Sequence, residues 1–340
     1  MAIISRILAS RLVRWGFLAA VIAFAVYYVA RDWGDIRHAL ERIGPWAALA
    51  SLVFVLAALV ASMLVWRTLL AGLGSHLPLR AASRVLFIGQ LGKYLPGSVW
   101  PVLAQMELAT EHKVPRGRTA AASIINMAVT LLAGLLVGLI ALPFTGGVGR
   151  YWWVFGVAVP LVACLYPAVL NRLLRLAFKL LRRPPLEHPL TGRVILASLG
   201  WSAVCWFCYG LQIWILMVKT GAGPARALPL AIGGFALAFA VGFVVILAPA
   251  GAGFRDVLLI AFLGSMIGTG PATAVTLVSR IATTAGDLTT AGLAAASYRR
   301  GRSGAGTTAT AGKGERAAEQ SPRPVMDNDD VKGFKAAGRG

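Results

Sequence analysis

The chain has 340 residues, of which 58% are hydrophobic and only 14% are charged. A soluble domain averages roughly 45–50% apolar and about 25% charged residues, so this composition excludes an ordinary soluble fold. The formal net charge is +20. The basic residues gather at the amino terminus, in two interior loops and in the tail, which fits the positive-inside rule and argues against a nucleic-acid-binding module.

Unbroken apolar runs, without the alternation of barrel strands, predict an all-α, polytopic transmembrane helical bundle. An integral membrane domain is expected over residues 1–298, with roughly seven or eight spans. The first run follows several arginines and is expected to be a retained signal anchor. Apolar segments are expected at residues 15–30, 45–66, 119–142, 152–170, 194–218, 228–247, 257–267 and 273–297.

Two Pro- and Gly-rich breaks interrupt this apolar sequence, one in each half of the chain. The first lies within residues 85–109 and reads Gly-Gln-Leu-Gly-Lys-Tyr-Leu-Pro-Gly-Ser-Val-Trp-Pro. The second opens residues 248–267 and reads Ala-Pro-Ala-Gly-Ala-Gly-Phe-Arg-Asp. Irregular backbone survives at membrane depth only where protein or a watery cavity satisfies its polar groups. The pattern predicts two re-entrant or broken helices in pseudo-repeated halves, which is typical of transporter binding sites.

The loops predict how the chain is oriented. Counts of Lys and Arg in the short loops place both termini in the cytoplasm. The most basic interior loop, residues 172–193, also carries a row of leucines, so it is either an interfacial helix or a solvated loop that only sets topology. Residues 299–340 are rich in Gly, Ala and Thr and are expected to form a disordered cytoplasmic tail.

Ionisable side chains at bilayer depth are costly and usually functional, so they are the candidate site residues. Lys93 lies in the first break, and Arg255 and Asp256 end the second. Arg280 and Asp287 are seven residues apart and share one face of the last span. The candidate substrate-binding residues are Lys93, Tyr94, Gly97, Ser98, Glu107, Gly251, Gly253, Arg255, Asp256, Arg280 and Asp287.

The residues around each break suggest what it binds. Ser98 can cap a half-helix whose free N–H groups, with about half a positive charge, point into the first break. A second half-helix is expected to begin near Phe254, and Arg255 in its first turn needs an anionic partner, which is Asp256, Asp287 or a phosphate. Lys93 and Arg255 are therefore expected to face a common cavity that suits a phosphate.

Each charged candidate also has a structural interpretation. Lys93 can snorkel to the interface, Asp256 can serve only as a helix-start residue, and Glu107 can be interfacial. Arg280 and Asp287 can form ion pairs with another helix that stabilise the bundle, and this interpretation is as well supported as a substrate role. The two roles overlap, since releasing an ion pair is one way to gate a site.

The sequence offers no motif for a cofactor or a metal. Cys205 and Cys208 have no second Cys or His pair at zinc spacing, so they are expected to be small buried hydrophobes. No Walker motif is present, and the four histidines lie far apart in the sequence. Gly134 and Gly138 form a Gly-x-x-x-Gly pair that either drives dimers or packs within the bundle, and the oligomeric state stays open.

The two breaks together resemble a known family. The stretch Gly-Lys-Tyr-Leu-Pro-Gly-Ser-Val-Trp-Pro at 92–101, followed by Pro-Ala-Gly-Ala-Gly-Phe-Arg-Asp at 249–256, is similar to the flippase-type transmembrane region of the lysylphosphatidylglycerol synthetase/flippase family. The resemblance implies a membrane protein that moves modified or polyprenyl-linked anionic lipids between leaflets, with both stretches as its re-entrant motifs. Only a short tail follows here in place of the family's soluble aminoacyltransferase domain, so lipid aminoacylation is not expected.

Three functions follow as hypotheses. The first is a non-enzymatic flippase or transporter that recognises an anionic lipid headgroup. The second is a membrane enzyme that modifies a lipid or a polyprenyl phosphate, which would have to use Glu107 with Asp256 or Asp287. The third is a non-transporting partner of lipid- or glycan-modifying enzymes.

Overall fold

The computed structural model describes residues 32–95, 99–141, 160, 163–164, 166–180, 190–244 and 253–319. These residues form helices and no strands, so the all-α prediction is confirmed. The chain divides into two compact units, Met1–Ala295 and Ala296–Gly340. The first unit contains every candidate site residue.

Four helices are long and apolar enough to cross a membrane, among the residues that the structure describes. They are α3 (Trp33–Gly72), α6 (Arg116–Ala141), α10 (Gly192–Lys219) and α11 (Pro224–Val244). They contain the spans predicted at 45–66, 119–142, 194–218 and most of 228–247. The predicted span at 15–30 and most of that at 152–170 lie outside the described residues.

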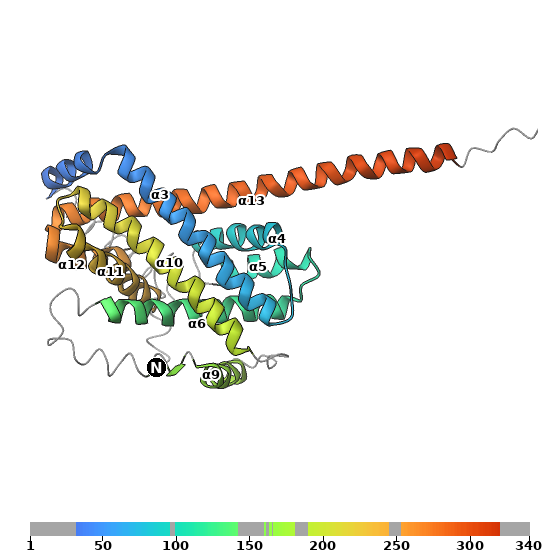
Figure 1. Ribbon diagram of the computed structural model, residues 1–340, viewed down its shortest axis with the longest axis horizontal. Coiled ribbons are helices and arrows are strands. Elements are labelled where there is room, and N and C mark those ends of the chain that lie inside the picture. The colour runs from blue at the N-terminus through green and yellow to red at the C-terminus, as the bar shows by residue number, and fades with distance from the viewer. Residues whose placement is uncertain are drawn as a thin grey trace, which may run out of the picture. The chain divides into compact units, whose positions relative to one another are not determined.

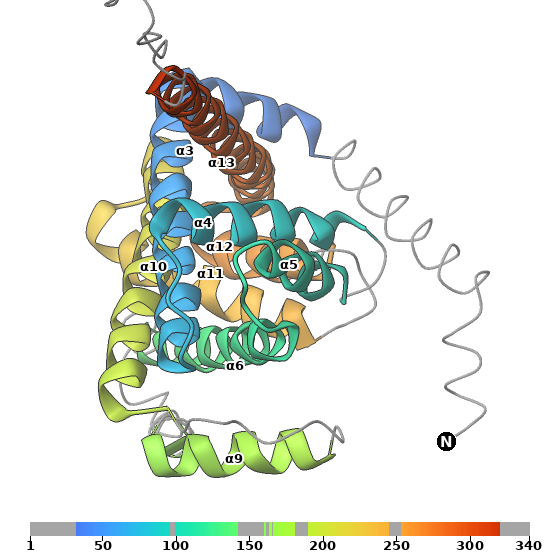
Figure 2. The same ribbon diagram turned by 90° about the vertical axis from the view of Figure 1, so that its right-hand side faces the viewer.

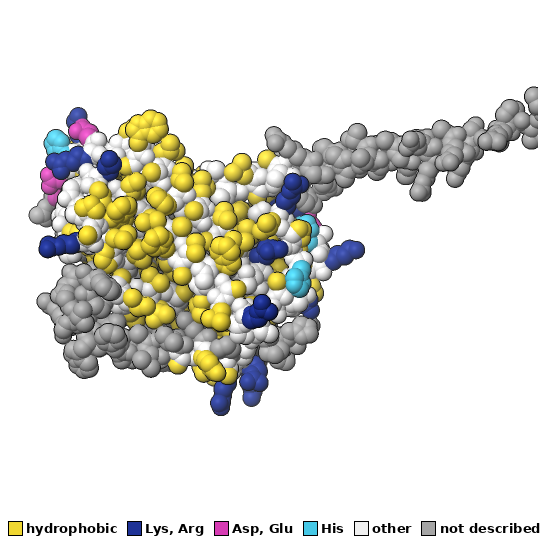
Figure 3. All heavy atoms as spheres, in the orientation of Figure 1, with side chains coloured by type: hydrophobic (Ala, Val, Ile, Leu, Met, Phe, Trp, Pro, Cys, Tyr) yellow, Lys and Arg dark blue, Asp and Glu magenta, His cyan; other side chains and the backbone are white. Residues whose placement is uncertain are grey.

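Helices α3 and α10 form the backbone of the bundle and run side by side over most of their length (Figures 1 and 2). α3 contains a kink at Gly44 (φ 62°), directly before Pro45, so a short amino-terminal helix precedes the predicted span. Apolar side chains remain on the outer surface, among them Val53, Leu196 and Phe207. Figure 3 shows a broad hydrophobic face with Lys and Arg side chains toward its edges, as lipid contact requires.

The first break separates two short helical pieces that pack on each other. α4 (Leu79–Ser83) continues through the π-helical turn η1 (Arg84–Ile88) and the 3-10 turn η2 (Leu91–Tyr94). After the break, α5 (Trp100–Thr110) returns beside η1 and η2 (Figure 2). A side chain at Gly92 would lie 2.9 Å from the backbone of Trp100, so this close approach requires glycine. The broken helix is observed, whereas its re-entry from one membrane side stays a prediction.

The second break leads into the last two helices. α12 (Phe254–Ile267) is followed by Gly268 (φ 83°) and then by α13 (Thr269–Glu319). The predicted segments at 257–267 and 273–297 lie within these helices. α13 extends to Glu319, and the disorder expected for residues 299–340 stays a prediction.

Small residues and buried polar groups hold the helices together. Gly134 faces Trp206 of α10 and Gly138 faces Leu237 of α11, so this Gly-x-x-x-Gly pair packs within the bundle. The Ser51 hydroxyl donates to Gln212 Oε1 at 2.9 Å, and Gln212 Nε2 donates to Ser279 Oγ at 2.7 Å. These buried bonds connect α3, α10 and α13 where no water can replace them.

Gly210 provides a test of this packing, because a Cβ there would lie 2.7 Å from the backbone Cα of Ile232 on α11. We expect Gly210→Ala to force α10 and α11 apart and to lower stability by about 1–3 kcal/mol. The readout is the temperature at which the detergent-solubilised protein loses its monodisperse peak in size-exclusion chromatography.

Gly200 on the same helix is the matched control, because a Cβ there meets nothing within 4 Å. Gly200→Ala should leave the midpoint unchanged or raise it slightly, since alanine favours helix. Equal midpoints for the two variants would contradict the close packing of α10 and α11.

Candidate functional site

A buried carboxylate on α13 binds the first break. Asp287 Oδ2 lies 2.6 Å from Lys93 Nζ and accepts a hydrogen bond of 2.6 Å from the Tyr94 hydroxyl. The Asp287 side chain is 5% exposed, whereas that of Lys93 is 34% exposed. Lys93 therefore does not simply snorkel to the surface, because its ammonium group is paired inside the bundle.

A second ionic group lies at the start of α12. Asp256 Oδ1 is 3.5 Å from Arg255 Nη2, and Asp256 Oδ2 is 3.7 Å from Arg280 Nη1. Of the two carboxylates predicted as partners of Arg255, the one in contact with it is thus Asp256, and the phosphate alternative stays a prediction. Arg255 Nε is buried and has no hydrogen-bond partner among the described residues.

The local sequence explains how α12 begins. Gly253 has φ 89°, a left-handed conformation that glycine adopts at no steric cost. Its N–H donates to Asp256 Oδ2 at 3.2 Å, so Asp256 does serve as a helix-start residue. The same carboxylate also contacts two arginines, which a simple cap does not need.

One face of α13 joins the two breaks. Arg280 and Asp287 are two helical turns apart, and Arg280 contacts the second break while Asp287 contacts the first. The predicted pairing of these residues with other helices is therefore observed, and the partners are Asp256 and Lys93. The five side chains comprise three cations and two carboxylates, which leaves a formal excess of one positive charge.

Aromatic side chains that the charge analysis missed pack against this cluster. The Arg255 guanidinium lies over the Phe235 ring, 5.5 Å from its centre. Tyr209 stacks on Phe235 with ring centres 5.1 Å apart. A signal was present in the sequence, because Phe235, Phe239 and Phe243 repeat at helical spacing on α11.

The remaining candidates are not part of this cluster. Glu107 pairs with Arg116 at 2.7 Å, and its side chain is 69% exposed, which matches its interfacial interpretation. Gly97, Ser98 and Gly251 lie outside the described residues. The predicted capping of α5 by Ser98 thus stays a prediction.

In the part of the chain that the structure describes, no group of three or more His, Cys, Asp or Glu side chains is placed to hold a metal ion. Cys205 is buried and Cys208 is partly buried, as expected for small hydrophobes, and neither forms a disulfide.

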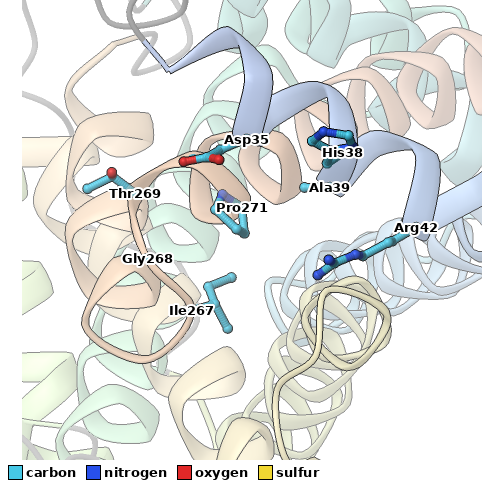
Figure 4. Close-up of a pocket in the computed structure, with 9 residues that line it drawn as sticks. Asp35, His38, Ala39, Arg42, Ile267, Gly268, Thr269 and Pro271 are labelled. Atoms are coloured by element: carbon cyan, nitrogen blue, oxygen red, sulfur yellow. The ribbon is translucent and has the colours of Figure 1, made fainter.

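A hollow of about 530 Å³ lies away from the ionic cluster, between the start of α3 and the turn from α12 to α13 (Figure 4). Asp35, His38 and Arg42 line one side, and the turn around Gly268 lines the other. None of the predicted site residues lines it. Its charged side chains are solvent-exposed, so it lacks the buried, desolvated polar groups that the ionic cluster has.

The fold and the cluster define a polytopic helical membrane protein with ionisable side chains between its helices. Residues 11–289 match the family described as Lysylphosphatidylglycerol synthase TM region, and the chain belongs to this family. The family resemblance seen in the sequence is therefore confirmed. A comparison with curated proteins found no match.

Removing the Asp287 carboxylate tests the link between α13 and the first break. We expect Asp287→Ala to destabilise the protein by about 3 kcal/mol, because the Lys93 ammonium then loses its partner inside the bundle. Adding Lys93→Met should recover most of the loss, since no unpaired charge remains. The measurement is the thermal midpoint of the purified single and double variants.

Glu107→Ala is the matched control, because it breaks an ion pair on the exposed surface. Its midpoint should equal that of the unmodified protein. A midpoint for Asp287→Ala no lower than that of Glu107→Ala would rule out a stabilising role for the Lys93–Asp287 pair.

Proposed function

We propose that this protein binds the phosphate-bearing headgroup of an anionic membrane lipid and moves that lipid between leaflets. The observation that carries the proposal is the ionic cluster of Lys93, Arg255, Asp256, Arg280 and Asp287, with its excess positive charge among apolar helices. Charged side chains at membrane depth are costly, and they mark functional sites such as substrate pathways. Membership of the family supports a lipid-related role.

Arg255 is the proposed primary contact for the phosphate. Its guanidinium carries donors in a fixed fork that matches phosphate oxygens, and Nε has no partner among the described residues. The amino-terminal end of α12 adds the partial positive charge of the helix dipole. An anion at this position is stabilised by both the Arg255 guanidinium and the dipole of α12.

The carboxylates of Asp256 and Asp287 are proposed to hold the cations when no lipid is bound. Unpaired cations inside the bundle are costly, so an empty site needs internal counterions. An entering phosphate exchanges with Asp256 for Arg255 and Arg280, and its departure restores the original pairs. This exchange keeps the charge of the site balanced through a transport cycle.

The broken helices are proposed to provide the path. We infer that η1, η2 and α5 form a re-entrant hairpin, because Lys93 and Tyr94 at its tip contact the buried residue Asp287 of α13. The chain is proposed to lie in the cell membrane with both termini in the cytoplasm, an orientation that its basic loops favour. The protein itself is proposed to transport and not to catalyse, and lipid- or glycan-modifying enzymes are its proposed functional partners.

Leaflet exchange in proteoliposomes tests the proposal. We expect the purified protein to move a fluorescent phosphatidylglycerol between leaflets, measured as the fraction that membrane-impermeant dithionite bleaches over time. Arg255→Gln and Lys93→Gln should each lower this rate by about tenfold or more, because a charge-assisted contact contributes roughly 1.5–3 kcal/mol.

Arg116→Gln is the control variant, since it removes an exposed cation that pairs with Glu107 away from the cluster. It should transport at the unmodified rate. Unchanged transport in both cluster variants would refute the proposed site. Chemical modification of the lipid, detected by mass spectrometry, would favour an enzyme instead. The absence of both lipid exchange and lipid modification would favour a partner subunit.

A further inference from the structure

Helix α9 (Pro167–Leu180) carries two distinct stripes on its outer surface. Its charged residues are Arg172, Arg175 and Lys179, all exposed, and the helix contains no acidic residue. A second exposed stripe is apolar and includes Leu173 and Leu176, which are 42% and 63% exposed. The helix is therefore strongly amphipathic on the side that it does not use for packing.

The opposite side of α9 is attached to the bundle. Leu170 is buried, and the side-chain amide of Asn171 forms hydrogen bonds with the backbone of Leu190 just before α10. The Asn171 Nδ2 group donates to the Leu190 carbonyl at 2.9 Å, while the Leu190 N–H donates to Asn171 Oδ1 at 3.0 Å. With 3.6 residues per turn, the three cations lie on the side of the helix away from Leu170, and the apolar stripe lies between the two.

The direction of α9 also differs from that of the long helices. Figure 1 shows α9 end-on and Figure 2 shows it lengthwise, whereas α3 and α10 are seen lengthwise in both. The axis of α9 thus crosses the axes of these two candidate spans at the end of the bundle where α10 begins. A helix with this direction lies along a membrane surface when the spans cross the membrane.

We propose that α9 is a membrane-surface helix that binds the anionic lipid leaflet. Its apolar stripe enters the boundary between headgroups and acyl chains, and its cations contact lipid phosphates. The charge complementarity identifies the occupant, because three cations on a helix that contains no acidic residue favour an anionic surface over a neutral one. This interpretation replaces the alternative of a solvated basic loop, and it does not depend on lipid transport.

Spin labels at two positions of α9 in the full chain test the proposal, after Cys164, Cys205 and Cys208 are replaced by alanine. One label is attached through Leu176→Cys on the apolar stripe and the other through Ala168→Cys on the cationic side. In vesicles that contain phosphatidylglycerol, the label at 176 should be several-fold more accessible to oxygen than to a water-soluble nickel complex. The label at 168 should show the reverse preference.

The dependence on lipid charge is tested with the label at 176. Its protection from the nickel complex should fall in pure phosphatidylcholine vesicles, and also when Arg172, Arg175 and Lys179 are changed to glutamine. These side chains are exposed, so their loss should not unfold the protein, which size-exclusion chromatography verifies. Equal water access at 168 and 176, or no response at 176 to lipid charge and to the glutamine changes, would overturn the proposal.

Discussion

The contacts of Arg280 and Asp287 are the constraint on which the site depends. One face of α13 carries both residues, and through them it contacts Asp256 in the second break and Lys93 with Tyr94 in the first. Broken helices at membrane depth leave backbone and side-chain groups that lipid cannot satisfy. A single continuous helix with one cation and one anion, two turns apart, supplies a partner to each break.

The charge balance of the cluster links stability with function. Each carboxylate neutralises cations that would otherwise be costly inside the bundle, so the resting protein keeps its ion pairs. The balance is incomplete by one positive charge, and Arg255 is held over the Phe235 ring with Nε unpaired among the described residues. In the proposed function, this excess charge and the unpaired Nε group bind one anion.

The rest of the fold positions this cluster without taking part in its chemistry. Glycine contacts such as that of Gly210 with Ile232 bring α10 against α11, which places Tyr209 on Phe235 beneath Arg255. At the end of the bundle where α10 begins, the hydrogen bonds between the Asn171 side chain and the Leu190 backbone hold α9 across the axes of α3 and α10. The proposed surface helix and the proposed lipid site are thus held by one rigid set of packed helices.

The sequence by itself determined the class of protein, most span positions, both breaks and the identity of the ionisable residues. These features depend on local hydrophobicity and on Pro and Gly, which act within a few residues of chain. Only the tertiary structure decided which side chains pair with one another. Tyr94 and Asp287 are 193 residues apart, and the sequence offered several carboxylates as possible partners of Lys93 and Arg255. The tertiary structure also decided that Glu107 pairs at the surface and that Gly134 and Gly138 face neighbouring helices, since a helix face has no partner until the bundle assembles.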